Sequence, residues 1–257
     1  MKKGVDISEH NGIINFEIAK DYIDFAIIRV SFGKKGIDKT AIRNIENCIK
    51  YNIPFGCYLY SYALNLNDAV IEANNFLKII LPYKDKISIG ACIDMEDADL
   101  YKKKNGFPTN EMICEIVNLE CRIFENAGLR PIIYASSYWF NSILNSSDLD
   151  NYTKWIAWWN ENAKIDKNTY KIWQYTSKGH IAGIEGSVDL NMIFDNLEKT
   201  NKELLLEDVL KYPEYTHETL IKLIENDTLK GTNGRIELNI ESVRLLVILD
   251  RNKLFES

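Results

Sequence analysis

The sequence predicts an α/β protein, in which a βα-barrel loses its helices near its end and is followed by a small all-α domain. First, eight short apolar, β-branched runs recur along the chain, and eight is the number of strands in a closed barrel. Second, stretches with helical spacing separate the first six runs. Third, strand signals stop after Phe194. We therefore expect a barrel over residues 1–199 and a helical domain over residues 200–257.

The expected strands are short and regularly spaced. They are Lys3–Ser8, Phe25–Phe32, Pro54–Ala63, Ile87–Asp94, Pro131–Ser136, Lys154–Asn160, Tyr170–Thr176 and Ser187–Phe194. The clearest helix between them is Thr109–Ala127, which stops before Gly128, and Thr40–Tyr51 and Asp68–Leu81 have similar spacing. Only about ten residues join the last three strands to one another, whereas a parallel crossover needs a dozen or more. We therefore expect the late strands to pair as antiparallel neighbours.

The strand pattern of the first 199 residues gives way to a helical pattern in residues 200–257. A boundary is expected near residue 200, in the polar stretch Glu198–Glu203. Three amphipathic helices and one turn follow, over Lys202–Lys211, Thr216–Glu225, Gly231–Gly234 (the turn) and Ile240–Asp250. A unit of about 55 residues buries little apolar surface by itself, which makes self-association through it an option.

Charge and hydropathy exclude several classes of partner. Residues 1–199 carry 23 Lys and Arg against 26 Asp and Glu, and residues 200–257 carry 8 against 11, so each part has a net charge of −3. Neither part has a basic tract, which argues against nucleic acid and against an anionic membrane surface. No segment approaches the roughly 20 apolar residues of a membrane-spanning helix.

The N-terminus does not read as a secretory signal. Lys2 and Lys3 resemble a charged leader, but Asp6, Glu9 and His10 fall where its apolar region should be. We therefore expect synthesis in a host cytoplasm without a signal peptide, and action elsewhere only after release.

The cysteines and histidines do not form a metal motif. Five cysteines show no C-x-x-C spacing and sit mostly in apolar runs, which favours buried thiols. The three histidines are scattered along the chain. We expect no metal and no cofactor.

One expected strand, Ile87–Asp94, ends in a run of four carboxylates within six residues. Asp94 and Glu96 are two residues apart, so on a strand they would share a face, and Asp97 and Asp99 follow them. Chemistry in barrels occurs at the carboxyl ends of strands. Negative neighbours would raise the pKa of Glu96, as glycosidic cleavage requires of its acid. A solvated acidic loop is the alternative interpretation.

Two further acids lie in matching Val-Asp contexts. Asp6 lies near the end of the first strand and Asp189 on the last strand. Because the first and last strands of a closed barrel are neighbours, these acids are expected to meet. Each could instead be a turn or cap residue.

Among the many aromatic side chains, which are mostly core, Tyr62, Tyr134 and Trp158 are the ones we expect to touch a sugar substrate.

Taken together, these residues resemble glycoside hydrolase family 25. The matching pieces, in the family's order, are Val5–Ser8, Ala26–Val30, Pro54–Tyr58, Ile93–Glu96, Pro131–Tyr134, Trp155–Ala157, Trp173–Tyr175 and Val188–Asn191.

The resemblance implies a (βα)5β3 TIM-like barrel followed here by a small all-α domain. It implies a lysozyme that hydrolyses the β-1,4 bond between N-acetylmuramic acid and N-acetylglucosamine in bacterial peptidoglycan. By resemblance Glu96 is the general acid and then base, Asp94 assists, and Asp6 and Asp189 complete the site.

The segment Glu218–Arg251 looks like the small helical wall-targeting modules of phage endolysins, which implies a cell-wall polymer as its ligand. A dimerisation or stability appendage is the alternative for this segment. For the whole chain the rivals are a barrel glycosidase on another polysaccharide such as chitin, a non-catalytic wall-binding protein, and a wall amidase or peptidase. The last normally needs a metal or a nucleophilic triad, which the scattered histidines disfavour.

Overall fold

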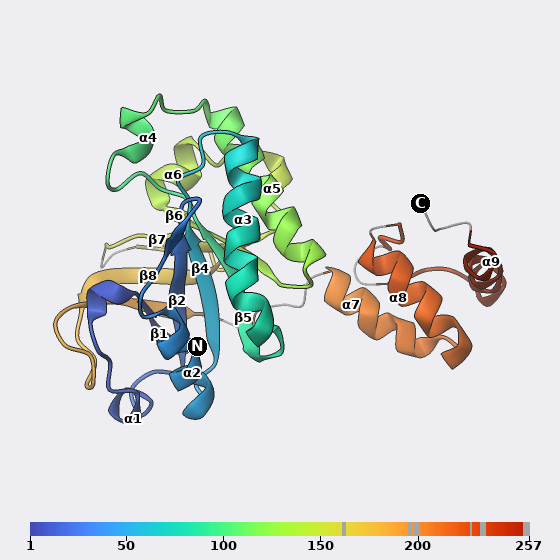
Figure 1. Ribbon diagram of the computed structural model, residues 1–257, viewed down its shortest axis with the longest axis horizontal. Coiled ribbons are helices and arrows are strands. Elements are labelled where there is room, and N and C mark those ends of the chain that lie inside the picture. The colour runs from blue at the N-terminus through green and yellow to red at the C-terminus, as the bar shows by residue number, and fades with distance from the viewer. Residues whose placement is uncertain (161–162, 195–196, 198–200, 227, 232–234, 254–257) are drawn as a thin grey trace. The chain divides into compact units, whose positions relative to one another are not determined.

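The computed structural model describes residues 1–160, 163–194, 197, 201–226, 228–231 and 235–253. The chain divides into two compact units, Met1–Leu197 and Glu198–Ser257 (Figure 1). Residues 198–200 of the expected boundary stretch and residues 232–234 of the expected turn lie outside the described residues. None of the helices in the described part of the chain is long and apolar enough to cross a membrane.

The first unit is a closed barrel, as predicted. Its eight barrel strands within the described residues are β1 (Lys2–Ile7), β2 (Phe25–Phe32), β4 (Phe55–Tyr60), β5 (Ile87–Asp94), β6 (Pro131–Ser136), β7 (Thr153–Ala157), β8 (Tyr170–Gly179) and β9 (Val188–Ile193). The sheet closes because β1 pairs with both β2 and β9. A short strand that the sequence did not indicate, β3 (Gly36–Ile37), pairs with the end of β2.

The direction of one late strand differs from the prediction. Strand β9 is antiparallel to β8 and to β1, as expected for a short connection. Strands β7 and β8, however, are parallel, so the antiparallel prediction was wrong for this pair. The reason is that β7 ends at Ala157, three residues earlier than expected. The connection therefore spans residues 158–169 and reaches the length that a parallel crossover needs.

Helices cover the outside of the barrel. They are α1 (Phe16–Ala19), α2 (Ala41–Lys50), α3 (Leu66–Ile80), α4 (Tyr101–Lys104), α5 (Asn110–Asn126) and α6 (Ser137–Ser142), with 3-10 turns η1 (Glu9–Asn11), η2 (Leu81–Lys86) and η3 (Ser147–Leu149). Helix α5 begins as its sequence predicts, because the Thr109 side chain accepts a hydrogen bond from the Met112 amide at 3.2 Å. It ends before Gly128, whose φ of 71° favours glycine.

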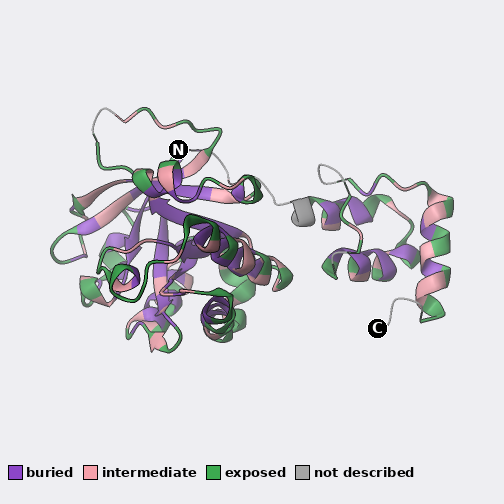
Figure 2. Ribbon diagram, turned by 90° about the horizontal axis from the view of Figure 1, so that it is seen from above, coloured by how far each residue is buried: buried purple, intermediate pink, exposed green. Residues whose placement is uncertain are grey.

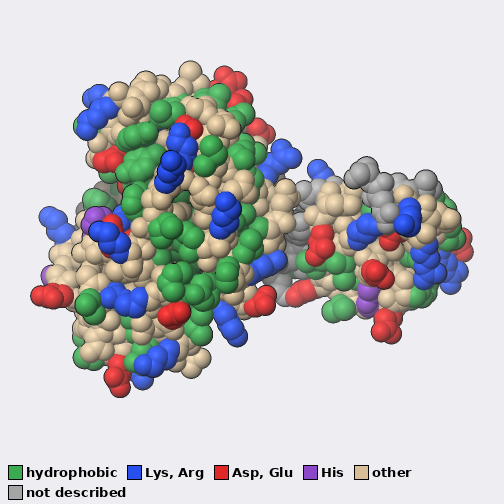
Figure 3. Space-filling view, in the orientation of Figure 1, with side chains coloured by type: hydrophobic (Ala, Val, Ile, Leu, Met, Phe, Trp, Pro, Cys, Tyr) green, Lys and Arg blue, Asp and Glu red, His purple; other side chains and the backbone are tan. Residues whose placement is uncertain are grey.

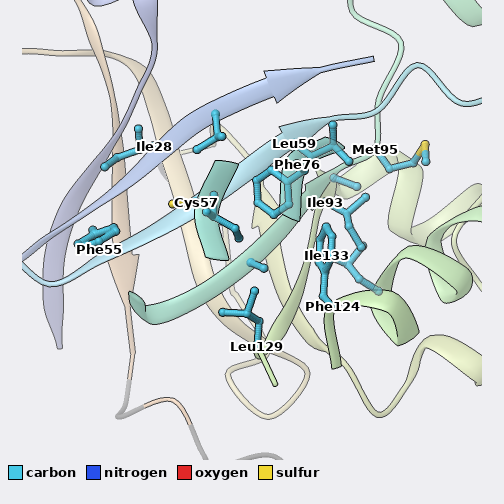
Figure 4. Packing of buried hydrophobic residues seen from close by; sticks show 14 of the residues in the cluster. Ile28, Phe55, Cys57, Leu59, Phe76, Ile93, Met95, Phe124, Leu129 and Ile133 are labelled. Carbon is cyan, nitrogen blue, oxygen red and sulfur yellow. The ribbon is translucent and has the colours of Figure 1, made fainter. Parts of the chain in front are cut away.

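Two apolar cores lie on opposite faces of the barrel sheet. The outer core packs the sheet against α3 and α5, where the rings of Phe76 and Phe124 lie 5.0 Å apart (Figure 4). The inner core fills the barrel with alternate residues of the strands, among them Phe25, Ile27 and Trp155. Burying each such side chain contributes about 1.5–3 kcal/mol. Alternation along the strands thus sends apolar side chains to both faces of the sheet, and Figure 2 shows the barrel strands as mostly buried.

The second unit is helical in the part that the structure describes. It contains α7 (Asn201–Asp208), η4 (Val209–Lys211), η5 (Glu214–Thr216), α8 (His217–Glu225) and α9 (Ile240–Arg251). Its apolar cluster is small and is built on Leu205, Val209, Leu220, Ile224, Ile236 and Val243. Two buried or half-buried carboxylates hold its segments together by accepting hydrogen bonds, Asp208 from the Ile236 amide at 2.9 Å and Asp250 from the Thr219 hydroxyl at 2.9 Å.

Candidate active site

The four acids singled out in the sequence lie on strands or strand ends at one rim of the barrel. Asp94 is the last residue of β5, and Glu96 follows it by two residues. Asp6 stands near the end of β1 and is the register partner of Asp189 on β9. Because β9 runs antiparallel to the other strands, the residue near its beginning reaches the rim where they end. The expected meeting of Asp6 and Asp189 therefore follows from a direct cross-strand pairing.

Asp6 and Asp189 hydrogen-bond to each other, which requires a proton between the two carboxyls. The pKa of Asp189 rises to about 8, first because burial disfavours its charge and second because Asp6 lies beside it. Burial also raises the pKa of Asp6, although hydrogen bonds from neighbouring side chains oppose the shift. The shared hydrogen bond raises the pKa of Asp189 and lowers that of Asp6, so Asp189 is the donor of the pair.

Gln174 of β8 orients the Asp6 carboxylate. Its amide nitrogen donates to Asp6 Oδ2 at 2.9 Å. Its amide oxygen accepts from the Tyr134 hydroxyl and from Trp159 Nε1, each at 3.0 Å. These two donors fix which end of the amide faces Asp6, so the orientation of Gln174 is determined by its partners.

Asn191 of β9 acts in the same way. Its amide nitrogen donates to Asp6 Oδ2 at 2.7 Å, and its amide oxygen accepts from Trp155 Nε1 at 2.8 Å. Neither amide was among the site residues predicted from the sequence. Both lie inside the motifs Trp173–Tyr175 and Val188–Asn191, so a polar residue on an inward strand position was the available signal.

Asp94 is a buried carboxyl without a full set of partners. Its side chain is buried, and Oδ1 has no hydrogen-bond partner in the described part of the chain. Burial raises the pKa of Asp94 well above its usual value, and the charge of Glu96 raises it further. Two carboxyls so placed cannot easily be charged together, so the pair can supply one proton and one charge.

Glu96 is half-buried, and its pKa rises to about 7. Burial is the largest cause, the positive charge of Lys102 opposes it, and Asp6 and Asp99 add to the rise. Negative neighbours were the cause predicted from the sequence. The direction of that shift is as expected, but the loss of solvent contributes more than the neighbouring charges.

The other two acids of the run fasten the short helix α4. Asp97 accepts hydrogen bonds from the backbone amides of Lys102 and Lys103 at 2.7 and 3.0 Å. Asp99 accepts from the Tyr62 hydroxyl at 2.7 Å and from the Tyr101 amide at 3.1 Å. Asp97 and Asp99, two of the four acids in the run, therefore stabilise α4.

The three aromatic side chains expected to contact substrate differ in exposure. Tyr62 packs against Tyr60 and Tyr101, with ring centroids 5.0 and 4.6 Å away. Tyr134 is almost completely buried, whereas Trp158 lies partly exposed just after β7. Their contact with a sugar stays a prediction.

In the part of the chain that the structure describes, His, Cys, Asp and Glu form no group of three suited to a metal ion. All five cysteines are buried free thiols. Lys, Arg, Asp and Glu side chains are interspersed over the face of the first unit in Figure 3.

A family model described as "Glycosyl hydrolases family 25" matches residues 5–184, which is most of the barrel and all of the acidic run. The chain belongs to glycosyl hydrolase family 25. Asp6, Asp94 and Glu96 lie inside the matched range, whereas Asp189 and the whole helical unit follow it.

Relatives of this family 25 chain include lysozymes. Lysozyme M1 of Streptomyces globisporus is 24% identical over 196 residues, which cover 74% of this chain and 66% of that protein. The modular autolysin LytC of Streptococcus pneumoniae, solved in complex with a synthetic peptidoglycan ligand, is 30% identical with a TM-score of 0.67. That match covers 74% of this chain and 46% of LytC.

The catalytic domain of endolysin ply40, from bacteriophage P40 of Listeria monocytogenes, is 25% identical with a TM-score of 0.57. That match covers 75% of this chain and 93% of the domain. The family 25 chain thus spans about two thirds of the length of Lysozyme M1 and under half of LytC. What these matches have in common with it is the barrel unit.

Proposed function

We propose that this family 25 chain is a lysozyme that hydrolyses the β-1,4 bond between N-acetylmuramic acid and N-acetylglucosamine in bacterial peptidoglycan. The observation that carries the proposal is the Asp94–Glu96 pair. A half-buried Glu96 with a pKa of about 7 stands two residues from a buried, incompletely partnered Asp94. The peptidoglycan ligand of LytC supports this class of substrate.

The pair can supply both groups that glycosidic cleavage needs. Below a pH of about 7, Glu96 holds a proton that it can donate to the leaving oxygen. The positive charge of buried Lys102 lowers the pKa of both carboxyls and so favours a negative charge on the pair. In this proposal Asp94 carries that charge while Glu96 holds its proton. That charge lies beside the cation-like centre of the transition state. Glu96, once deprotonated, can take a proton from the attacking water.

Asp6 and Asp189 have a supporting role in this proposal. Asp6 and Asp189 share a hydrogen bond at the rim, and Gln174 and Asn191 fix the position of the Asp6 carboxylate. A charge held by several oriented dipoles needs little rearrangement during the reaction.

Mass spectrometry of fragments from digested peptidoglycan tests the proposal. The expected product carries N-acetylmuramic acid at its new reducing end. Reducing N-acetylglucosamine would indicate a glucosaminidase, and free peptide amines without new reducing ends would indicate an amidase or peptidase. Reducing ends released from chitin but not from peptidoglycan would favour another polysaccharide, and binding without fragments would favour a non-catalytic wall-binding protein.

We further propose that the helical unit binds a cell-wall polymer and that the enzyme works as an endolysin. In this proposal it is made in a host cytoplasm and acts on the wall after release. The likeness to the ply40 catalytic domain supports the endolysin assignment. The position of the helical unit after the family match supports a function separate from catalysis. Self-association through this unit is the competing proposal.

A further inference from the structure

Helix α4 carries a lysine that is completely buried. Lys102 has a relative exposure of 0%, while Lys103 beside it is exposed. The ammonium group of Lys102 donates to the carbonyl oxygen of Ser61 at 2.5 Å and to that of Glu96 at 2.8 Å. Ser61 follows the end of β4, so one ammonium group ties the loop after β4 to the main chain of the candidate acid.

A second pair of buried carboxyls lies behind this lysine. Glu72 of α3 and Glu120 of α5 are both fully buried, and the Ser61 hydroxyl lies 3.0 Å from Glu72 Oε2 and 3.4 Å from Glu120 Oε1. One hydroxyl proton can serve only one of them. Burial raises the pKa of both Glu120 and Glu72, and the shorter of the two Ser61 contacts is the one to Glu72. Ser61 then donates to Glu72, which also accepts from the Tyr62 amide at 3.1 Å.

The acids that face Lys102 come from every neighbouring element. They are Asp94 of β5, Glu72 of α3, Glu120 of α5 and Asp97 of the loop before α4. Burying an ammonium group is costly unless hydrogen bonds and opposite charges compensate. Here the compensation comes from a carbonyl of the candidate acid and from the carboxyl next to it, which connects the buried charge to the reaction.

We propose that Lys102 is a positioning residue of the glycosidase site, whose ammonium group holds the main chain of Glu96 against the end of β4 and supplies the positive charge behind the Asp94–Glu96 pair. This inference rests on the proposed function. Lys102 acts through Glu96 and Asp94, because a fully buried side chain cannot touch a polysaccharide.

Removing the positive charge of Lys102 should shift the pKa values of Glu96 and Asp94 in a known direction. The positive charge of Lys102 lowers the pKa of both Glu96 and Asp94. Without it, both carboxyls keep their protons to higher pH. The acidic limb of the pH–rate profile, where Asp94 must lose its proton, and the alkaline limb, where Glu96 must keep its own, both move upward.

The test compares Lys102→Met with Lys103→Met, which removes an exposed charge from the same helix. Rates on soluble peptidoglycan chains are measured across pH for the full chain. For Lys102→Met we expect the profile to move up by about one pH unit and kcat at the wild-type optimum to fall by about tenfold, with KM nearly unchanged. Lys103→Met should match wild type. A profile of Lys102→Met that keeps its wild-type position, whatever its height, overturns the proposal, because a purely structural role would lower activity without moving the profile.

Two further measurements cover the remaining cases. If Lys102→Met does not fold, the double variant Lys102→Met/Glu72→Gln replaces it, because it removes the buried cation together with one buried carboxyl that faces it. Its pH–rate profile is then compared with that of wild type. A carbon-13 NMR titration of the Glu96 carboxyl, assigned by its absence in Glu96→Gln, needs no activity. If wild type releases no fragments, the proposed function fails; an upward shift of the Glu96 titration in the Lys102 variant then upholds the electrostatic role, and an unmoved titration overturns it.

Discussion

The candidate-site aspartates of the barrel and the aspartates of the helical unit are used in opposite ways. In the barrel, burial raises the pKa of Asp94 and Asp189 above the usual value. In the helical unit, hydrogen bonds hold the pKa of Asp208 and Asp250 below it. Asp208 accepts from a backbone amide and from Lys211, and Asp250 accepts from Thr219 and Lys222.

This difference separates carboxylates that hold a fold together from carboxylates prepared for chemistry. A carboxylate whose oxygens all accept hydrogen bonds is stable as an anion and resists protonation. A buried carboxyl with an unpartnered oxygen, such as Asp94, is costly as an anion, which raises its pKa well above the usual value. We therefore expect substitutions in the two units to change different measurements.

The largest effect is expected for Glu96→Gln. The amide keeps the shape of the side chain but has no acidic proton for the leaving oxygen, so the rate of lysis should fall at least ~100-fold. Turbidity loss of purified walls measures it. Asp97→Asn is the matched control from the same acidic run. Its amide oxygen can still accept one of the two α4 amides that the two oxygens of Asp97 accept, and it should lyse walls nearly as fast as wild type. Lysis by Glu96→Gln at a wild-type rate would remove Glu96 from the site.

The three supporting acids should differ in how much kcat falls when each is replaced by asparagine. Asp94→Asn removes the negative charge near the transition state and should lower kcat severely. Asp6→Asn and Asp189→Asn should cost less. Because Asp189 carries a proton below a pH of about 8, its amide substitute can still donate to Asp6, and we expect Asp189→Asn to be the mildest of the three. Equal losses for all three variants in kcat measurements would contradict this ranking.

Removal of the helical unit should leave chemistry intact. The four acids lie within Met1–Leu197, which has its own core, so residues 1–199 should hydrolyse soluble peptidoglycan chains at the wild-type rate. Lysis of whole cells should fall, because a second contact with the wall raises the local enzyme concentration. A fluorescent fusion of residues 200–257 should label cells, and its labelling should persist in moderate salt since the segment is not basic. A fusion that stays in solution, together with full lysis by the shortened chain, would leave the helical unit as an assembly element.

The smallest effect on activity is expected for Asp250→Asn. It weakens the links from α9 to Thr219 and Lys222, so the unfolding midpoint of the helical unit should fall by roughly 2–5 °C. Because the pKa of Asp250 is lowered, its contribution is present above the ordinary value of 3.8 and is lost as the pH falls below it. Calorimetry at neutral and acidic pH should show this difference shrink in acid. A change in kcat on soluble chains would contradict the separation of the two units.

The sequence by itself determined the barrel, its strands and the rim acids, because strand alternation and the ends of apolar runs are local features. It also predicted that Asp6 and Asp189 would meet, since closure of a barrel makes its first and last strands neighbours. The antiparallel prediction for β7 and β8 failed because the exact end of β7 depends on pairing, which shifts the length of the connection.

Only the tertiary structure decided which charges are buried. In the sequence Lys102 and Lys103 are equivalent members of one lysine run, and the packing of α4 against the barrel buries only the first of these two. Likewise, Gln174 and Asn191 become partners of Asp6 through contacts between strands that are distant in the chain. Desolvation depends on all the atoms around a group, so neither the pKa of Glu96 nor the lysine behind it follows from the order of residues.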